Sequence, residues 1–392
     1  MPYVLFRSIF GLWYNAQMMK KKKWICASLA LLLAGCSTTQ KTTMEDLYSN
    51  ISLDAGFDTV LYYQEYNADT EASKAHFEET VSLFSHYNEL FDIYNDYEGV
   101  SNIKTINDFA GISPVVVDPA IIEMLNEAKA FSTMSDDEFD VTIGSLLKVW
   151  HNYREEGQAL NEDGKSGNVP SISELEEAAQ FEGWDKVIID EEASTVYITD
   201  PEVSLDVGGI AKGFATEKIA ETLEEKEDIG TVVINAGGNN RTIHTKPDGS
   251  SWRVSIQNPD GGSSFLTVSA EDSISFVTSG DYERYYTAED GTRYHHIIDP
   301  DTLFPADHYR SVTIITKDSG AADCLSTALF TMTIDKGKAM LETYEQETGE
   351  TADAIWIMDK DKADSSVKGT ELQNFIIVAT DNIKDDITYA IS

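Results

Sequence analysis

Apolar residues recur at helical spacing in some stretches of the chain and alternate with polar residues in others. The helical stretches predict a long helix over residues 71–94, a helix from Asp118-Pro119 to about residue 131, and a helix that starts at Asp318. Residues 154–170 are polar and contain several glycines, which predicts an exposed loop. The alternating stretches predict short strands at residues 59–66, 186–190, 195–199, 231–235, 252–256, 265–268, 274–278 and 293–298.

The predicted strands are concentrated in the second half of the chain, and several predicted helices lie in the first half. No Pro- or Ser-rich linker divides the chain after residue 50. We therefore expect one large α+β domain over residues 51–392, with a β-rich half and flanking helices.

The first 35 residues have the features of a targeting segment. A basic run, Lys20–Lys23, precedes an apolar stretch that is too short to span a bilayer. Leu33-Ala34-Gly35-Cys36 resembles the lipobox of bacterial lipoproteins, in which the chain is cut before the cysteine and the cysteine is acylated. We therefore expect a signal peptide over residues 1–35, whose true start is Met18 or Met19, then a lipidated Cys36 and a polar tether over residues 36–50. The alternative is an ordinary secretory signal with a chance cysteine.

The 392-residue chain carries a formal net charge of −39. Such a charge repels nucleic acid and anionic membrane surfaces, so we expect no nucleic-acid partner. A binding site for an anion must supply its own metal ion or dipoles to offset this field. With Cys26 in the signal peptide and Cys36 lipidated, Cys324 has no disulfide partner and is predicted to be a small buried side chain.

Asp323 and Thr327 lie four residues apart in the apolar helix predicted after Asp318. Their oxygens therefore project from one helix face, where they suit a hard cation such as Mg²⁺. The alternative is structural: Thr327 bonds back to its own helix, and Asp323 interacts with the helix dipole.

A glycine-rich turn precedes another predicted helix in the segment Asp206-Val-Gly-Gly-Ile-Ala-Lys-Gly213. A strand–turn–helix arrangement of this kind brings backbone N–H groups to a phosphate, with Lys212 as a point charge. Asn235-Ala-Gly-Gly238 again places glycines at a strand end, where backbone is accessible to a ligand. Either segment is equally compatible with a tight bend that needs glycine for steric reasons.

Two adjacent histidines end the predicted strand 293–298. Successive side chains of a strand point to opposite faces, so we expect at most one of them to enter a site. His296 is followed by Ile297-Ile298-Asp299-Pro300, which places it near a strand end. It is a candidate for a catalytic or phosphate-binding role, against the usual structural role of a histidine on a strand.

Six motifs occur together, and in this order they resemble the ApbE family, the FAD:protein FMN transferases. The resemblance extends from about residue 54 to the C-terminus. The motifs are Phe139-Asp-x-Thr-x-Gly144, Asp206-x-Gly-Gly-Ile-Ala-Lys-Gly213, Asn235-Ala-Gly-Gly238, Thr278-Ser-Gly-Asp-Tyr282, His296-Ile-Ile-Asp-Pro300 and Ala322-Asp-Cys-Leu-Ser-Thr327.

The resemblance implies a reaction in which FAD is split at its pyrophosphate. FMN is then joined through a phosphoester to a threonine of an extracytoplasmic flavoprotein, and AMP is released. It further implies an Mg²⁺ site made by the Asp323 and Thr327 side chains and the carbonyl of Ala211. His296 and Asp323 are the implied catalytic residues. The implied FAD-binding residues are Asp206, Gly208, Gly209, Lys212, Asn235, Gly237, Gly238, Ser279, Gly280, Asp281, Tyr282, His296 and Ile297.

The chain departs from the family pattern in three places. After Asp299-Pro300 the family runs on to Thr-Gly-x-Pro, whereas this chain has Thr302-Leu303-Phe304-Pro305. Phe57-Asp58-Thr59 stands where the family has a Met-Gly-Thr-like strand start, and Cys324 replaces a more usual alanine.

Three other functions remain open at this stage. An Mg²⁺-dependent FAD pyrophosphatase would use the same site with water as the acceptor. A non-catalytic flavin-binding lipoprotein would lack the metal ligands, which are present here. A solute-binding lipoprotein would alternate strands and helices, unlike the β-rich stretch 252–298. The transferase is expected to act at the extracytoplasmic face of the cell membrane, held there by its lipid anchor.

Overall fold

The computed structural model describes residues 46–363 and 367–390. The predicted signal peptide, its start at Met18 or Met19, the lipidated Cys36 and the tether up to residue 45 lie outside the described residues. Residues 46–50 do not belong to a tether, because strand β1 (Asp46–Ser52) pairs along its whole length with β2 (Leu61–Asn67). The prediction was wrong here because β1 is a largely exposed edge strand with few apolar residues, which gives no clear sequence pattern.

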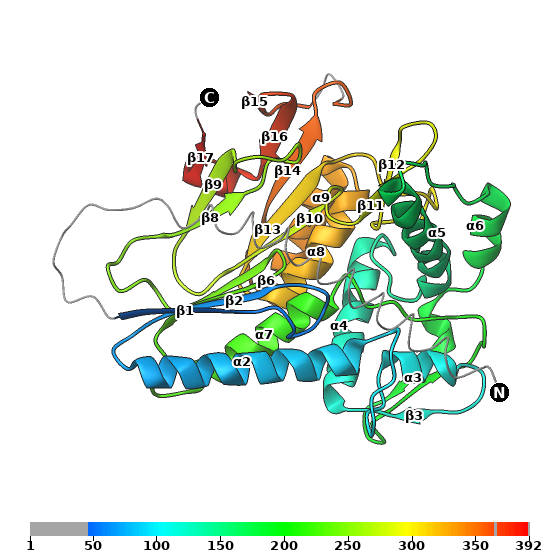
Figure 1. The fold of residues 1–392 in the computed structure, drawn as a ribbon, viewed down its shortest axis with the longest axis horizontal. Helices are drawn as coiled ribbons and strands as arrows, with labels where there is room; N and C mark the ends of the chain where they lie inside the picture. Colours follow the sequence, from blue (N-terminus) through cyan, green and yellow to red (C-terminus); the bar gives the residue numbers. More distant parts are fainter. Residues whose placement is uncertain (1–45, 364–366, 391–392) are drawn as a thin grey trace. The chain divides into compact units, whose positions relative to one another are not determined.

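In the described part of the chain, nine strands form an antiparallel sheet with the strand order β1-β2-β6-β7-β10-β13-β14-β16-β15 (Figure 1). Most predicted strands are confirmed with small changes at their ends. The remaining strands of this sheet are β6 (Thr231–Ala236), β7 (Asn239–Ile243), β10 (Ser275–Gly280), β13 (Ser311–Thr316), β14 (Asp353–Asp359), β15 (Thr370–Leu372) and β16 (Phe375–Ala379).

The two faces of this sheet are covered by different layers. On β13, Val312 and Ile314 join the core formed with the helices, and Ile315 joins a second core with a small sheet of order β17-β9-β8. This period-two alternation is expected for a strand buried on both faces. The helices on the first face are α2 (Thr70–Phe91), α7 (Ala211–Glu224), α8 (Ser319–Thr331) and α9 (Ile334–Thr348), and α4 (Pro119–Ser135) packs on α8 and α9. The small sheet consists of β8 (Trp252–Ile256), β9 (Leu266–Ala270) and β17 (Ile387–Tyr389).

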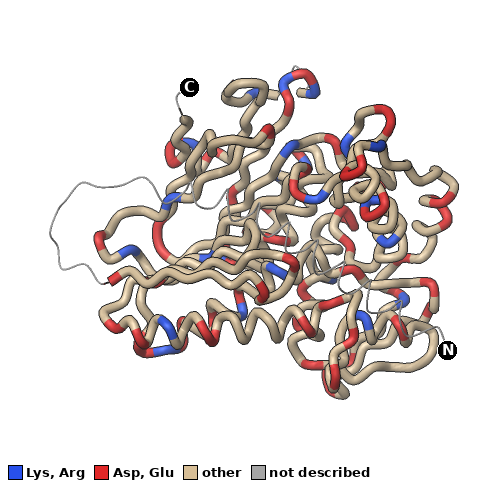
Figure 2. Tube along the Cα trace, in the orientation of Figure 1, with Lys and Arg blue, Asp and Glu red and all other residues tan. Residues whose placement is uncertain are grey.

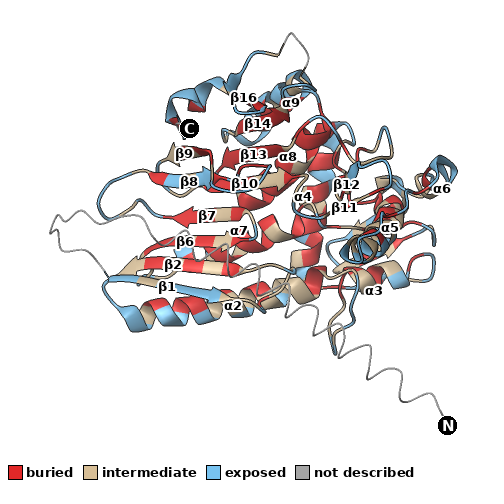
Figure 3. Ribbon diagram, turned by 45° about the horizontal axis from the view of Figure 1, so that its top comes forward, coloured by how far each residue is buried: buried red, intermediate tan, exposed pale blue. Residues whose placement is uncertain are grey.

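The helix starts follow the capping signals in the sequence. The Asp118 carboxylate accepts the N–H of Ala120 at the start of α4, and Pro119 occupies its first turn. The Asp318 carboxylate accepts the N–H groups of Gly320 and Ala321 at the start of α8. Helix α8 is buried along nearly all of its length (Figure 3), which its continuous apolar sequence predicts.

Residues 154–162 are helical, so the predicted loop over residues 154–170 was wrong in its first half. They complete α5 (Gly144–Glu162), which has its apolar side chains near its start and a polar face toward solvent. Tertiary contacts hold its second half. Gly157 lies against the Tyr286 ring, and Asn161 exchanges hydrogen bonds with the backbone of Thr287. These contacts fall in β11 (Tyr285–Thr287), which pairs with β12 (Arg293–His295) beside α5 (Figure 1).

The rest of the domain consists of short elements. They are α3 (Ile103–Asp108), α6 (Ile172–Ala178), the 3₁₀ turns at Trp184–Lys186 and Asp381–Asp386, and a three-stranded sheet of β3 (Val115–Val116), β5 (Thr195–Ile198) and β4 (Val187–Asp190). The strands predicted at residues 186–190 and 195–199 are confirmed, and they pair with each other as β4 and β5. No helix within residues 46–363 and 367–390 is both long and apolar enough to cross a bilayer.

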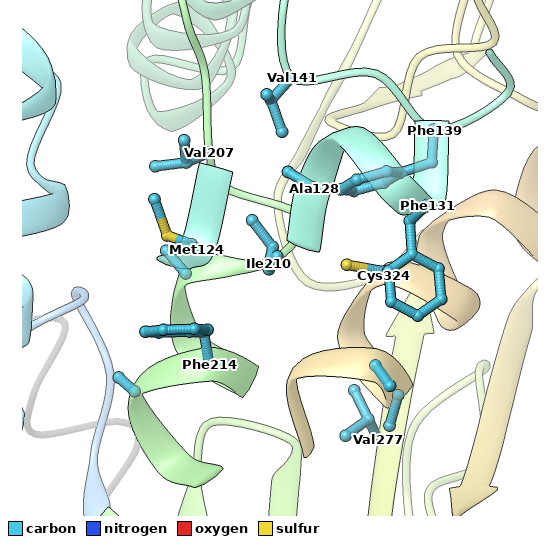
Figure 4. Close-up of a cluster of buried hydrophobic side chains, with 14 of the residues drawn as sticks. Met124, Ala128, Phe131, Phe139, Val141, Val207, Ile210, Phe214, Val277 and Cys324 are labelled. Carbon is cyan, nitrogen blue, oxygen red and sulfur yellow. The ribbon is translucent and has the colours of Figure 1, made fainter. Parts of the chain in front are cut away.

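Cys324 confirms its prediction, since it is a free cysteine with no exposed surface. It belongs to a cluster to which α4, α7, α8 and the segments around Phe139 and Val207 contribute side chains (Figure 4). Burial raises the pKa of its thiol well above the usual range, which disfavours the reactive thiolate. The role of Cys324 is therefore structural: its cluster packs these elements against the segment of the glycine-rich turn.

Candidate active site

Helices α7 and α8 touch at Gly213, and this contact organises the candidate site. A Cβ atom on Gly213 would lie 2.2 Å from the Ser319 carbonyl oxygen and 2.6 Å from the Asp323 Cβ, so only glycine allows the approach. The Gly213 N–H, in the first turn of α7, donates to Asp323 Oδ2 at 2.8 Å. The carboxylate of α8 thus satisfies an N–H group at the start of α7 that has no partner within its own helix.

The predicted metal ligands Asp323 and Thr327 lie on this inner side of α8. Asp323 is 4% exposed, and Lys212 Nζ lies 3.7 Å from its Oδ2. Thr327 lies against the glycine-rich turn, with its Oγ1 3.3 Å from where a Cβ on Gly209 would be. Asp318, not Asp323, caps α8, and Asp323 instead accepts an N–H at the start of α7, so its helix-dipole alternative is realised on the neighbouring helix. Ser326 and Thr331 bond back to carbonyls of α8, and Thr327 forms no such bond within the described residues.

The residues at this position fit a magnesium ion by the chemistry of their donors. The Asp323 carboxylate, the Thr327 hydroxyl and the Ala211 carbonyl are all oxygen donors. The Thr327 hydroxyl makes no hydrogen bond to another described residue. Within the described residues no group of three or more His, Cys, Asp or Glu side chains is placed to hold a metal. A site with one carboxylate suits Mg²⁺, which keeps several waters and binds substrate phosphates.

The glycine-rich turn is held by the Phe139–Gly144 motif. The Asp206 N–H donates to the Val141 carbonyl, and the Gly144 N–H donates to the Ser204 carbonyl. Instead of the short strand expected just before the glycine-rich turn, this segment forms a single isolated β-bridge, between Ile143 and Ser204. Asp206 accepts the Gly208 N–H at 2.9 Å, which fixes the turn before α7. Burial raises the pKa of the Asp206 carboxyl, against the opposing effects of that hydrogen bond and of Arg154, His151 and Arg284.

Asn235-Ala-Gly-Gly238 forms the turn of the β6–β7 hairpin. Gly237 and Gly238 have φ angles of +59° and +99°, which a type I′ turn requires. The Asn235 side chain bonds Asn240 within the hairpin. The next residue, Asn239, is 1% exposed. Its Oδ1 accepts from Lys212 Nζ at 3.5 Å, and its Nδ2 has no partner in the described structure. Sequence reasoning did not select Asn239, because its contact with Lys212 depends on how α7 packs on β7.

Ser279 and Gly280 end β10, and Asp281 and Tyr282 follow it. The Ser279 hydroxyl lies 2.8 Å from the Ser326 hydroxyl, which ties this segment to α8. Asp281 Oδ2 accepts from Arg310 Nε at 2.7 Å, while its Oδ1 is buried without a described partner. The Tyr282 ring packs over Gly280. Half of the Asp281 carboxylate is therefore engaged within the protein.

The two adjacent histidines differ, as the strand pattern predicts. His295 lies 2.7 Å from the Ala306 carbonyl through Nε2, and its Nδ1 accepts the Ile297 N–H. Both ring nitrogens are thus used, and burial lowers its pKa to about 4. His296 Nδ1 is buried and has no described partner. Burial lowers the pKa of His296 well below its usual value, and Arg284, His295, Arg154 and Lys212 lower it further. Of the two, only His296 is available for a ligand.

Two arginines that sequence reasoning missed lie near His296. Arg154, on α5, fell in the predicted loop, and Arg284 precedes β11. Arg154 Nη2 lies 2.9 Å from Nδ1 of His151, whose ring stacks on Tyr94 with a centroid distance of 4.9 Å. The pKa of Arg154 is lowered by burial and by Arg284, which indicates two neighbouring guanidinium groups. The sequence did contain a signal that could have pointed to these arginines, namely the scarcity of cations, with 29 Lys and Arg residues against 68 Asp and Glu residues. Figure 2 shows the charged residues spread over the domain.

Comparisons with known proteins agree with this architecture. The model of the ApbE family matches residues 57–350. The FAD:protein FMN transferase of Klebsiella pneumoniae is 32% identical over 290 residues, which cover 71% of this chain and 84% of that protein. The enzyme of the same name from Treponema pallidum is 33% identical over 260 residues, covering 62% and 68%.

Solved structures show the same fold. The crystal structure of the ApbE protein from Thermotoga maritima is 29% identical and superposes with a TM-score of 0.67, covering 79% of this chain and 94% of that one. The flavin transferase ApbE from Vibrio cholerae, 23% identical, has a TM-score of 0.66 over 87% of this chain and 99% of that one. The chain therefore belongs to the ApbE family.

Proposed function

We propose that the protein is an Mg²⁺-dependent FAD:protein FMN transferase. In this reaction the FAD pyrophosphate is cleaved, FMN is joined by a phosphoester to a threonine of an extracytoplasmic flavoprotein, and AMP is released. Two curated relatives with at least 32% identity carry the name of this activity. The single structural observation that supports it best is the contact at Gly213, which brings Asp323, Thr327, Lys212 and the Gly208-Gly209 turn together.

The residues of this contact have the properties that transfer of a phosphoryl-linked group requires. The Asp323 and Thr327 side chains and the Ala211 carbonyl would hold the magnesium ion, which would neutralise pyrophosphate charge and stabilise the departing AMP. Lys212 would place a positive charge on the phosphates, and Asn239 would keep its ammonium group in position. The backbone of the Gly208-Gly209 turn would approach the phosphates closely, since neither residue has a Cβ.

His296 is suited to accept the proton of the threonine hydroxyl. Its pKa lies well below the usual value, so the imidazole is neutral at neutral pH, and it has a ring nitrogen without a described partner that is able to take a proton. The same shift makes it a weaker base than an exposed histidine. As the threonine oxygen bonds to the phosphorus that carries riboflavin, the bond from that phosphorus to the AMP oxygen breaks. The proton moves from threonine to the imidazole, and the electron pair leaves with AMP.

The place of action is also a proposal. The lipobox at Cys36 supports a lipid anchor on the extracytoplasmic face of the cell membrane, near a membrane-bound acceptor. The structure describes no residue before 46, so this rests on the sequence pattern. Labelling with a radioactive or clickable fatty acid tests it, since lipid incorporation is expected in the native chain and not in Cys36→Ser.

The activity is tested with purified protein, FAD and Mg²⁺, with and without a threonine-containing flavoprotein acceptor. We expect AMP release together with flavin fluorescence that stays with the acceptor in a denaturing gel. Asp323→Asn keeps the side-chain shape and is expected to lower Mg²⁺-dependent turnover at least ~100-fold. Release of AMP with only free FMN, for every acceptor tried, would favour the pyrophosphatase instead. FAD that is bound but unchanged would contradict an enzymatic role.

A further inference from the structure

We propose that Arg154 and Arg284 form a two-guanidinium site for the phosphate that stays on the flavin, the phosphate shared by FMN and FAD. This site is separate from the α7–α8 contact that would hold the metal ion. The inference rests on the proposed function only in taking FAD as the substrate.

Strand register places Arg284 beside His296. Tyr285 of β11 pairs with His295 of β12 in an antiparallel ladder. Arg284 comes directly before this last pair and His296 directly after it, both at bends just beyond the end of the ladder. After burial, it is Arg284 that lowers the pKa of His296 most, ahead of the other charged groups around it. The register and this electrostatic effect together bring Arg284 close to the proposed base.

Docking of α5 brings Arg154 to the same place. Gln158 Nε2 donates to the Tyr285 carbonyl at 3.1 Å, and Gly157 lies against the Tyr286 ring. Arg154 is one helical turn before Gln158, on the same face of α5. Since Gln158 bonds the residue that follows Arg284, the two arginines lie side by side.

Neither guanidinium group forms an ion pair within the described residues, unlike those of Arg241 and Arg310. Arg241 pairs with Glu217 and Glu224, and Arg310 pairs with Asp260, Asp281 and Asp359. Arg154 is only half-buried and Arg284 is exposed, although the Asp206 carboxylate lies near enough to affect Arg154. The nitrogen that contacts Arg154 belongs to His151. In a chain with 68 acidic residues, two adjacent arginines without an ion pair indicate a site for an external anion.

Phosphate is the anion that fits this arrangement. Two planar guanidinium forks offer parallel N–H donors that match phosphate oxygens. The position beside His296 selects which phosphate of FAD is bound. The acceptor hydroxyl must reach the phosphorus bonded to the flavin side, and its base is His296. The adenylate phosphate would lie toward Lys212 and the metal-binding residues.

The test compares three flavins that differ only beyond the ribityl chain. Dissociation constants for riboflavin, FMN and FAD are measured by flavin fluorescence without Mg²⁺, for the native chain, Arg154→Met and Arg284→Met. We expect each substitution to weaken FMN and FAD binding roughly 10- to 100-fold, as for the loss of a charge-assisted hydrogen bond. Riboflavin binding is expected to change less than about twofold. Arg154→Lys keeps the charge but not the fork and is expected to restore part of the loss.

Arg253→Met, on the exposed side of β8, is the matched control and is expected to leave all three constants unchanged. Thermal unfolding of each variant separates misfolding from loss of the site. An equal loss of riboflavin binding, or unchanged FMN binding in both variants, would overturn the inference. These binding measurements do not depend on FMN transfer. If the protein transfers no FMN but the arginine variants selectively lose FMN and FAD binding, the phosphate site is supported and the proposed function is not. If the protein transfers FMN but the dissociation constants are unchanged in the arginine variants, the phosphate site is refuted.

Discussion

At the scale of single residues, Leu303 stands in a conformation that normally requires glycine. Its φ is +63°, and it is the residue at which this chain departs from the Thr-Gly-x-Pro pattern noted in the sequence. The turn nevertheless forms, because Asp299 Oδ1 accepts the N–H groups of Asp301 and Thr302 and Trp150 Nε1 donates to the Leu303 carbonyl at 2.8 Å. These hydrogen bonds hold the turn even though leucine stands at position 303. His296 follows β12 as the motif predicts.

Because of this strain, we expect glycine to be more stabilising than alanine at position 303, the reverse of their usual order in a helix. Leu303→Gly and Leu303→Ala both remove the side chain, but only glycine relieves the positive φ. We expect the glycine variant to be more stable by about 1 kcal/mol, measured by denaturant unfolding. At Lys338, an exposed helical position in α9, alanine should exceed glycine by a similar amount. An alanine variant at 303 that is the more stable of the two would show that the turn carries no strain.

At the scale of elements, the α7–α8 contact predicts that Gly213 tolerates no side chain. Gly213→Ala would place a methyl group 2.2 Å from a carbonyl oxygen, so the helices must separate. We expect a loss of about 1–3 kcal/mol in the free energy of unfolding. We also expect turnover to fall by more than this loss of stability alone would cause, because the Gly213–Asp323 hydrogen bond positions the carboxylate.

Gly337→Ala in α9 is the comparison for this substitution. Its methyl group would meet only side-chain carbons, at 3.1 Å or more, and alanine favours a helix. We expect a stability change within about 1 kcal/mol and unchanged activity, measured by chemical denaturation and AMP release. Equal effects of the two substitutions on activity would remove the α7–α8 contact from the site.

The elements show why some parts of the site could be predicted and others could not. The glycine-rich turn, the β6–β7 turn and the Asp323–Thr327 pair are contiguous in sequence, so their motifs were visible. Arg154 and Asn239 enter the site only through tertiary packing, of α5 on β11 and of α7 on β7. The second half of α5 has a polar sequence and is helical because of those contacts. β1 was missed because an exposed edge strand needs few apolar residues.

At the scale of the whole molecule, a buried carboxylate makes the stability of the fold depend on pH, in a chain with a formal net charge of −39. Glu127 of α4 faces the start of α8, where its Oε1 lies 2.9 Å from where a Cβ on Gly320 would be. Burial raises its pKa to about 8, with further contributions from Asp318, Glu123 and Glu217 and an opposing one from Lys218. The folded protein therefore binds a proton near neutral pH that the unfolded chain has already released.

The sign of the resulting pH dependence follows from this difference in bound protons. Between the unfolded pKa near 4.5 and the folded pKa near 8, the folded state holds more protons, so stability falls as pH rises. The histidines with lowered pKa values act in the opposite direction only below about pH 6.5, where the unfolded chain binds their protons. The window from pH 7 to 8.5 therefore reports on the carboxylates.

We expect the native protein to lose about 1 kcal/mol of stability between pH 7 and 8.5 through Glu127, a drop of about 2 °C in Tm. Glu127→Gln keeps the shape of the side chain without its charge and should flatten this part of the profile. Glu345→Gln, at an exposed position on α9, should leave it unchanged. A native profile that is flat over this window, or equally steep in Glu127→Gln, would show that the Glu127 carboxylate is ionised in the folded protein at pH 7. The excess negative charge would then act only through the surface, where salt screens it, and Tm would rise with ionic strength but not with falling pH.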